Sequence, residues 1–202
     1  MSWKNEQVSR GETEKILEIA RACLGVRGDF VEMGCYKGDT SLLLAEVLRD
    51  YNRGVAVEKR LWIYDSFEGL PEKSSADESA LGVDFKKGEL YVTKREVKER
   101  FLRSGLPVPV MKKGWFADLT PDDLPSEIAL AFLDGDLYES IRDSLRLVGP
   151  KMTSGGVILV HDYANLALPG VAKAVDEWMQ GKDLRLERFE SLAILTGFGV
   201  GN

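Results

Sequence analysis

The stretch VEMGCYKGDTS, residues 31–41, decides the fold class of this chain. The apolar segment 29–34 has the pattern of a strand that ends at a glycine, and the segment 39–51 has the apolar spacing of a helix. Gly34 and Gly38 let the backbone pass close to a ligand, and the following helix offers free N–H groups. The stretch predicts a strand–turn–helix unit, and by itself it fits a binding loop and a tight structural turn equally well.

The same alternation of strand and helix continues along the chain. Further strands are expected at 61–65, 108–114, 128–134 and 156–162, helices at 12–24, 93–105, 140–152 and 170–180, and a closing strand pair in 184–197. This order predicts one α/β domain, residues 1–202, around an open and mostly parallel sheet. The polar stretch 66–91 is too long for an ordinary connection, so we expect a lid or an inserted helix there.

Composition excludes several classes of function. The 202 residues carry a net charge of -6, which argues against binding along a nucleic-acid backbone. There is no apolar run of the roughly 20 residues that a membrane span needs, so no membrane partner is expected. The two cysteines, Cys23 and Cys35, form no CxxC pair, and this pattern favours a reducing compartment, the cytoplasm.

Ligands of such sheets bind beyond the carboxyl ends of the strands, and acidic residues end four of the five predicted parallel strands. Asp65, after the second strand, is suited to accept both hydroxyls of a ribose, or it is a loop or capping carboxylate. After the third strand, Trp115 or Phe116 is placed to lie flat on a purine, or both are core or lid aromatics. A row of acids is poorly explained by solvated strand ends alone.

The fourth and fifth strands end in AFLDGD and GVILVHD, which carry Asp134, Asp136, His161 and Asp162. Adjacent parallel strands would bring these side chains within a few ångströms of one another. Carboxylate oxygens with one imidazole suit Mg²⁺, Mn²⁺ or a similar ion. The alternatives for His161, the only histidine of the chain, are a structural histidine or a base without a metal.

Five stretches occur together in this order: VEMGCYKGDTS, WIYDSFEGLPE, KKGWFADLTPDDLP, AFLDGDLYESIRDSL and PKMTSGGVILVHDY. From about residue 28 to about 180 the chain thereby resembles the macrocin O-methyltransferase family of S-adenosylmethionine-dependent sugar methyltransferases. The resemblance implies the three-layer, Rossmann-like class I methyltransferase fold, with a seven-stranded sheet whose last strand is antiparallel. It also implies a Mg²⁺-dependent methyl transfer to a sugar hydroxyl on a natural product or glycan.

The resemblance further implies roles for the strand ends. The first would bind the methionine part of the cofactor, the second the ribose and the third the adenine. The full set expected to bind the cofactor is Glu32, Gly34, Tyr36, Gly38, Ser41, Asp65, Ser66, Phe67, Gly114, Trp115, Phe116 and Asp134.

Metal binding and catalysis are assigned to the last two parallel strands. We expect Asp134 and Asp162 to hold the metal, with His161 as third ligand, although the family usually has two aspartates where this chain has His161 and Asp162. Asp136 is the first candidate for general base and His161 the second.

Three other functions stay open at this point. A nicotinamide or flavin oxidoreductase lacks support because the chain has no Gly-x-Gly-x-x-Gly turn. A metal-dependent methyltransferase of a catechol or phenol would use the same strand-end geometry, and a non-catalytic S-adenosylmethionine-binding protein would keep the same binding residues. The expected partner is a small-molecule or glycan acceptor, with a homodimer as the candidate assembly.

Overall fold

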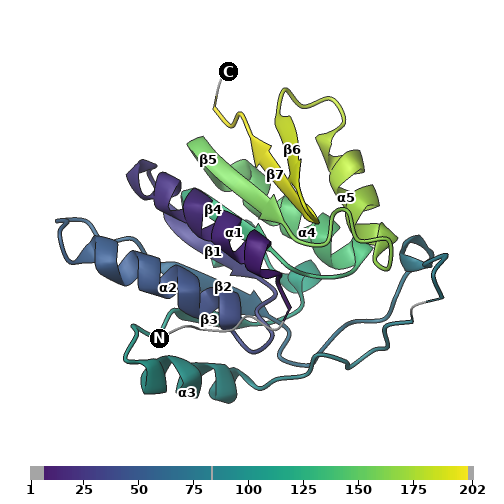
Figure 1. The fold of residues 1–202 in the computed structure, drawn as a ribbon, viewed down its shortest axis with the longest axis horizontal. Helices are drawn as coiled ribbons and strands as arrows, with labels where there is room; N and C mark the ends of the chain where they lie inside the picture. Colours follow the sequence, from purple (N-terminus) through teal and green to yellow (C-terminus); the bar gives the residue numbers. More distant parts are fainter. Residues whose placement is uncertain (1–6, 83, 200–202) are drawn as a thin grey trace.

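The computed structural model describes residues 7–82 and 84–199, which form one seven-stranded sheet with helices on both faces (Figure 1). The strands are β1 (Asp29–Met33), β2 (Leu61–Asp65), β3 (Val110–Lys113), β4 (Ile128–Leu133), β5 (Met152–Val160), β6 (Arg185–Phe189) and β7 (Leu192–Thr196). The helices are α1 (Arg10–Ala22), α2 (Asp39–Asn52), α3 (Lys94–Ser104), α4 (Tyr138–Val148) and α5 (Pro169–Met179).

The strand order is β3-β2-β1-β4-β5-β7-β6, and β7 is the strand that runs antiparallel to its neighbours β5 and β6. This confirms the fold class, including the antiparallel last strand. The chain moves outward from β1 to β3 and then returns to β4 on the other side of β1. The carboxyl ends of β1 and β4 therefore flank a topological switch point, where sheets of this kind bind ligands.

The core has two halves, one on each face of the sheet. On β4, Leu130 and Phe132 pack toward α1, α2 and α3, whereas Ala131 and Leu133 pack toward α4 and α5. All four side chains are fully buried. A central strand that is covered on both faces has to be apolar throughout, which is why β4 reads as the unbroken run IALAFL.

Several element boundaries differ from the sequence prediction. The helix expected to reach residue 152 ends at Val148, because Gly149–Lys151 forms a 3₁₀ turn that contains Pro150, and β5 begins at Met152 instead of 156. The third strand begins at Val110, since Pro107 and Pro109 cannot donate to the sheet. α1 begins two residues earlier than expected because Ser9 and Glu12 form a capping box.

After β2 the described residues of the segment 66–91 leave the sheet, and Asp77 in its middle lies beside the N-termini of α4 and α5. Its base is closed by two backbone hydrogen bonds, from Leu70 N to Glu89 O at 2.8 Å and from Gly88 N to Leu70 O at 2.9 Å. Within the described part of this segment the regular structure is one 3₁₀ turn, Ser75–Asp77, so the expected inserted helix is wrong there. None of the described helices is long and apolar enough to cross a membrane.

Candidate active site

The turn after β1 lies against the end of β4. The parallel ladders continue one residue beyond the strands, because Gly34 N donates to Tyr64 O and Asp134 N donates to Met33 O, both at 2.9 Å. Gly34 has a φ of 88°, and a Cβ there would lie 2.0 Å from the carbonyl oxygen of Asp134. Only glycine fits this contact, since backbone on both sides cannot move aside.

Asp65 at the end of β2 holds the glycine turn in shape. Its Oδ2 accepts hydrogen bonds from Cys35 N at 2.9 Å and Tyr36 N at 3.3 Å, and its Oδ1 accepts one from Phe67 N at 2.7 Å. A carboxylate offers about four acceptor positions. Asp65 therefore organises two strand-end loops with three of these positions, and it also lines the cavity described below.

Glu32 is a buried carboxyl group beneath the same turn. Its side chain accepts a hydrogen bond from the Ser41 hydroxyl, and both residues are almost completely buried. Burial raises the pKa of Glu32 to about 8, against the effect of the Ser41 hydrogen bond and with further increases from Asp134 and Asp65. Glu32 thus supports the turn from behind as a group that is predominantly protonated at neutral pH.

A cavity of about 480 Å³ opens at the switch point. This volume lies within the range of small-molecule and cofactor sites. The turn after β1, the end of β2, the loop after β3 and the start of α4 form its walls. The first part of the 66–91 segment adds the remaining wall, including Leu70, Pro71, Lys73 and Ser74.

A second group of side chains stands beside the cavity, at the ends of β4 and β5. His161 Nδ1 lies 2.9 Å from Asp134 Oδ1 and 3.1 Å from Asp162 Oδ2. His161 is buried, and the two aspartate side chains are largely so, with 20% and 13% of their surface exposed. Burial lowers the pKa of His161, but Asp134, Asp162 and Glu12 together raise it far above the ordinary histidine value.

Asp136 completes the acidic group and lines the cavity together with Asp134. Its removal from bulk water raises its pKa well above the usual aspartate value; Asp134 and Asp162 add to the increase and His161 opposes it. A carboxylate of raised pKa is a stronger base than an exposed one.

Backbone conformation sets the strand ends apart from the rest of the molecule. Among the described residues, six non-glycine positions have positive φ, and four of them, Tyr36, Phe67, Asp136 and Asp162, come just after β1, β2, β4 and β5. Such conformations persist only where the surroundings impose them, and they gather at functional sites. The loops that carry the candidate site are therefore held in uncommon backbone conformations by the surrounding structure.

The donor set at the end of β4 and β5 fits a small divalent ion. Asp134, His161 and Asp162 each offer one ligand atom, and these atoms lie within 4.8 Å of one another. In six-coordinate Mg²⁺, with bonds of about 2.1 Å, neighbouring ligand atoms are about 3.0 Å apart. The separations of 2.9 and 3.1 Å from His161 Nδ1 to the two carboxylates are short enough for the three side chains to hold one ion, and they are also ordinary hydrogen-bond and ion-pair distances.

The predicted site residues divide into two groups. The cavity is lined by Gly34, Tyr36, Asp65, Ser66, Gly114, Trp115, Phe116, Asp134 and Asp136. The residues that do not line it are Glu32, Gly38, Ser41, Phe67, His161 and Asp162. Of the second group, Glu32, Ser41 and Phe67 are buried behind the wall, whereas His161 and Asp162 stand beside Asp134. Their predicted roles remain predictions.

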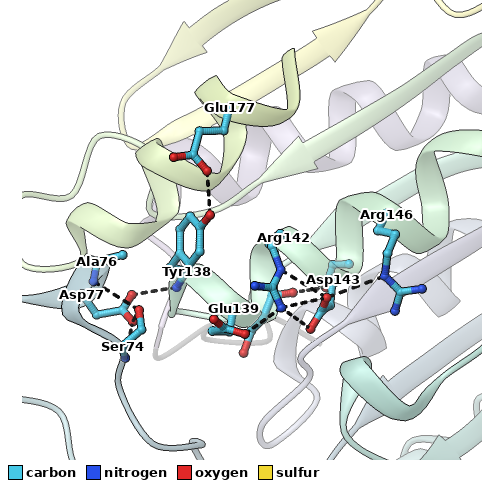
Figure 2. A network of polar contacts seen from close by, with 11 residues as sticks. Ser74, Ala76, Asp77, Tyr138, Glu139, Arg142, Asp143, Arg146 and Glu177 are labelled. Carbon is cyan, nitrogen blue, oxygen red and sulfur yellow. Dashed lines mark hydrogen bonds and ion pairs between the residues drawn. The ribbon is translucent and has the colours of Figure 1, made fainter. Parts of the chain in front are cut away.

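Sequence reasoning did not find several residues of this region. On α4, Glu139, Ser140 and Asp143 line the cavity, and Asp143 is held by Arg142 and Arg146 at 3.2 and 3.6 Å (Figure 2). Their helical spacing, DLYESIRD, was the available signal, because one face of a helix that begins at a strand end points into the site.

Asp77 was also missed, in the middle of the segment 66–91. Figure 2 shows its carboxylate reaching the first turn of α4, where Oδ1 accepts a hydrogen bond from Tyr138 N at 2.7 Å. Its Oδ2 accepts from Ser74 N at 2.9 Å and from the Ser74 hydroxyl at 2.8 Å. Asp77 therefore ties this segment to the body of the protein.

The fold and the site define a class. The seven strands with an antiparallel last strand, and the cavity at the switch point, are those of a class I methyltransferase fold. Among solved structures, that of the O-methyltransferase NovP matches with a TM-score of 0.77 and 27% sequence identity, over 95% of this chain and 82% of that chain.

Sequence comparison gives the family. The family model of Macrocin-O-methyltransferase (TylF) matches residues 13–191, and the chain therefore belongs to this family. The 8-demethyl-8-(2,3-dimethoxy-alpha-L-rhamnosyl)-tetracenomycin-C 4'-O-methyltransferase of Streptomyces olivaceus is 37% identical over 146 residues, 69% of this chain and 54% of that protein. Demethyldecarbamoylnovobiocin O-methyltransferase of Streptomyces niveus is 32% identical over 181 residues, 84% of this chain and 67% of that protein. The chain thus spans about half to two thirds of these relatives.

Proposed function

We propose that this protein is an S-adenosylmethionine-dependent O-methyltransferase that uses a divalent metal ion and methylates a sugar hydroxyl on a natural product or glycan. The observation that carries the proposal is the position of Asp134. It lines the cofactor-sized cavity and at the same time stands 2.9 Å from His161 in the group of potential metal ligands. A methyl donor in the cavity and an acceptor at the metal would therefore meet at this residue.

The cavity offers what the proposed donor requires. Trp115 and Phe116 supply aromatic surface for a purine, and Asp65 supplies acceptor capacity for ribose hydroxyls. The acidic surroundings of Asp65, Asp134 and Asp136 favour a ligand that carries positive charge. S-adenosylmethionine has these three features, and it supplies a methyl group on a sulfonium, from which transfer is an in-line displacement.

The acidic group supports activation of the acceptor. A divalent ion lowers the pKa of a hydroxyl that it binds and fixes its orientation. Asp134, His161 and Asp162 would hold the ion, and Asp136 would take the proton from the acceptor hydroxyl. Burial next to Asp134 and Asp162 raises the pKa of Asp136 above the usual aspartate value, which makes its carboxylate a stronger base than an exposed one.

The segment 66–91 is proposed to act as the cover of the donor. Leu70, Pro71 and Lys73 form one wall of the cavity, and Asp77 holds the segment in place on α4. A closed wall keeps water away from the reacting groups.

The acceptor class follows from the relatives, whose names describe a methyltransferase of a rhamnosyl-tetracenomycin and one of demethyldecarbamoylnovobiocin.

Calorimetry tests the donor and the metal separately. S-adenosylmethionine is titrated into the full chain with Mg²⁺ and with a chelator, and Mg²⁺ is titrated into wild type and Asp134→Ala. We expect micromolar binding of the donor and loss of metal binding in the variant. Activity is then assayed on deoxysugar-bearing and catechol acceptors side by side. Absence of donor binding under both conditions would refute the proposal, and turnover of catechols alone would correct the acceptor class.

A further inference from the structure

Glu12 of α1 lies next to the proposed metal site, although the amphipathic pattern of its helix marks it only as a capping residue. Its Oε2 stands 3.7 Å from His161 Nε2, on the opposite side of the imidazole from Asp134 and Asp162. The side chains of Glu12 and His161 are 5% and 6% exposed, so water contributes little to this contact. Among the described residues, Glu12 is the one whose carboxylate lies within ion-pair distance of His161 Nε2.

The position of the Glu12 carboxylate is itself fixed by the fold. Oε1 accepts hydrogen bonds from the backbone N–H of Ser191 at 3.0 Å and from the Ser191 hydroxyl. Oε2 accepts one from Ser9 N at 3.1 Å, within the capping box of α1. The hairpin turn between β6 and β7 and the start of α1 therefore hold this carboxylate from two directions.

We propose that Glu12 is a positioning residue for the metal site: it fixes the tautomer and the ring orientation of His161, so that Nε2 carries the hydrogen and Nδ1 is the ligand. This inference rests on the proposed metal site. A histidine that binds a metal through one nitrogen usually donates the other N–H to a carboxylate, which orients the ring and strengthens the ligand. Glu12 stands on the Nε2 side of His161, opposite Asp134 and Asp162, with Oε2 at the ion-pair distance of 3.7 Å; binding of the metal at Nδ1 would bring this contact to a hydrogen bond.

The arrangement also gives a reason for the histidine in this chain. An aspartate at position 161 would add a third carboxylate to those of Asp134 and Asp162. It would also lie beside Glu12 in a buried region, where the two carboxylates at positions 12 and 161 would repel each other. With His161, the Glu12 carboxylate instead faces, at ion-pair distance, a ring nitrogen that can carry a hydrogen. Glu12 and His161 are thus expected to act as a pair, and the effect of changing one should depend on the other.

The first test measures Mn²⁺ affinity of the full-length protein, without donor or acceptor, from the electron paramagnetic resonance signal of free Mn²⁺. Glu12→Gln is expected to weaken Mn²⁺ binding by roughly 10- to 100-fold. Ser9→Ala is the matched control: it removes the hydroxyl that accepts from Glu12 N and thereby weakens α1, but it leaves the Glu12 carboxylate beside His161. It should lower the thermal midpoint and leave Mn²⁺ affinity unchanged.

A double-mutant cycle separates positioning from general structural support. In a His161→Asp background, Glu12→Gln should no longer weaken Mn²⁺ binding, because the ring that Glu12 orients is absent and a repulsion is relieved. If Glu12→Gln weakens binding equally in both backgrounds, or no more than Ser9→Ala does, the inference is overturned while the metal site stands. If Asp134→Ala leaves Mn²⁺ affinity unchanged, the metal site itself is wrong and the inference fails with it.

The single histidine makes a direct readout available that does not depend on the His161→Asp variant. Protein labelled with ¹⁵N-histidine gives one pair of imidazole resonances, both from His161. On addition of Mg²⁺, the resonance of Nδ1 should shift toward that of a metal ligand while Nε2 keeps its hydrogen, and Glu12→Gln should remove this preference. A protonated Nδ1 in the Mg²⁺-saturated protein would overturn the inference.

Discussion

Replacement of Asp77 by alanine should release the segment 66–91 from α4 without unfolding the protein. Asp77 is 2% exposed, and among the described residues its hydrogen bond to Tyr138 N is the one that joins the segment to the helix. Tyr138 is the first residue of α4, so its N–H has no partner within the helix. Alanine would leave that N–H buried and unpaired.

The size of the effect follows from this one contact. A hydrogen bond to a charged acceptor contributes about 1.5 to 3 kcal/mol, and a negative charge at a helix N-terminus adds about 0.3 to 1 kcal/mol. We therefore expect the free energy of local opening to fall by about 2 to 3 kcal/mol, an increase of roughly 30- to 150-fold in the opening equilibrium. Because Lys73 and Ser74 line the cavity, the affinity for S-adenosylhomocysteine should fall as well.

Hydrogen–deuterium exchange with mass spectrometry measures this opening. Peptides that cover residues 70–80 and the start of α4 should exchange faster in Asp77→Ala, whereas peptides from β4 and β5 should be unchanged. Asp84→Ala is the matched control, since Asp84 lies in the same segment but forms an exposed ion pair with Lys73 at 2.8 Å. Exposed pairs contribute at most about 1 kcal/mol. Equal exchange in the two variants would refute the anchoring role of Asp77.

Three further predictions concern the strand ends. Gly34→Ala should prevent stable folding, because its Cβ would lie 2.0 Å from the Asp134 carbonyl oxygen; a circular-dichroism melt like that of wild type would contradict this. Glu32 has a pKa of about 8 in the folded state, against its ordinary value of 4.5. Between these two pH values the folded state keeps a proton that the unfolded chain releases, so the free energy of unfolding declines as the pH rises. Glu32→Gln should therefore gain stability over wild type from pH 5 to pH 8 in urea titrations, and parallel curves would argue against a protonated Glu32. Asp136→Asn should reduce turnover by about 100-fold or more while donor binding stays nearly intact; loss of donor binding by calorimetry would show that Asp136 has another role.

The architecture was predictable because its signals are local and repeated. The glycine turn at 31–41, the apolar run of β4 and the helix spacings each identify one element, and their order identifies the sheet. The acids at the strand ends could be assigned to one edge because parallel strands end on the same side. The boundary errors at Gly149–Lys151 and Pro109 arose where apolar periodicity continues past a residue that interrupts the backbone pattern.

The positioning residues were not predictable in the same way. Glu12 contacts Ser191 across a separation of 179 residues, and nothing in the helical pattern of α1 indicates what lies opposite its first turn. Asp77 lies in a polar stretch with several other acidic residues, and nothing in the local sequence distinguishes it from them. The spacing of Ser74 and Asp77 predicts a capped turn, but it does not predict which helix the turn packs against. Such residues become visible only when the tertiary structure shows which backbone groups lack partners.

The place of β7 between β5 and β6 has a consequence for biosynthesis. Until β7 is inserted, β5 has an unpaired edge, and the turn that carries Ser191 is not available to Glu12. The Glu12 carboxylate, near the start of the chain, therefore gains its hydrogen bonds from Ser191 only after the chain has been translated as far as the turn before β7. A nascent chain that is arrested before Ser191 already contains Asp134, His161 and Asp162, but its Glu12 carboxylate should lack the hydrogen bonds from Ser191.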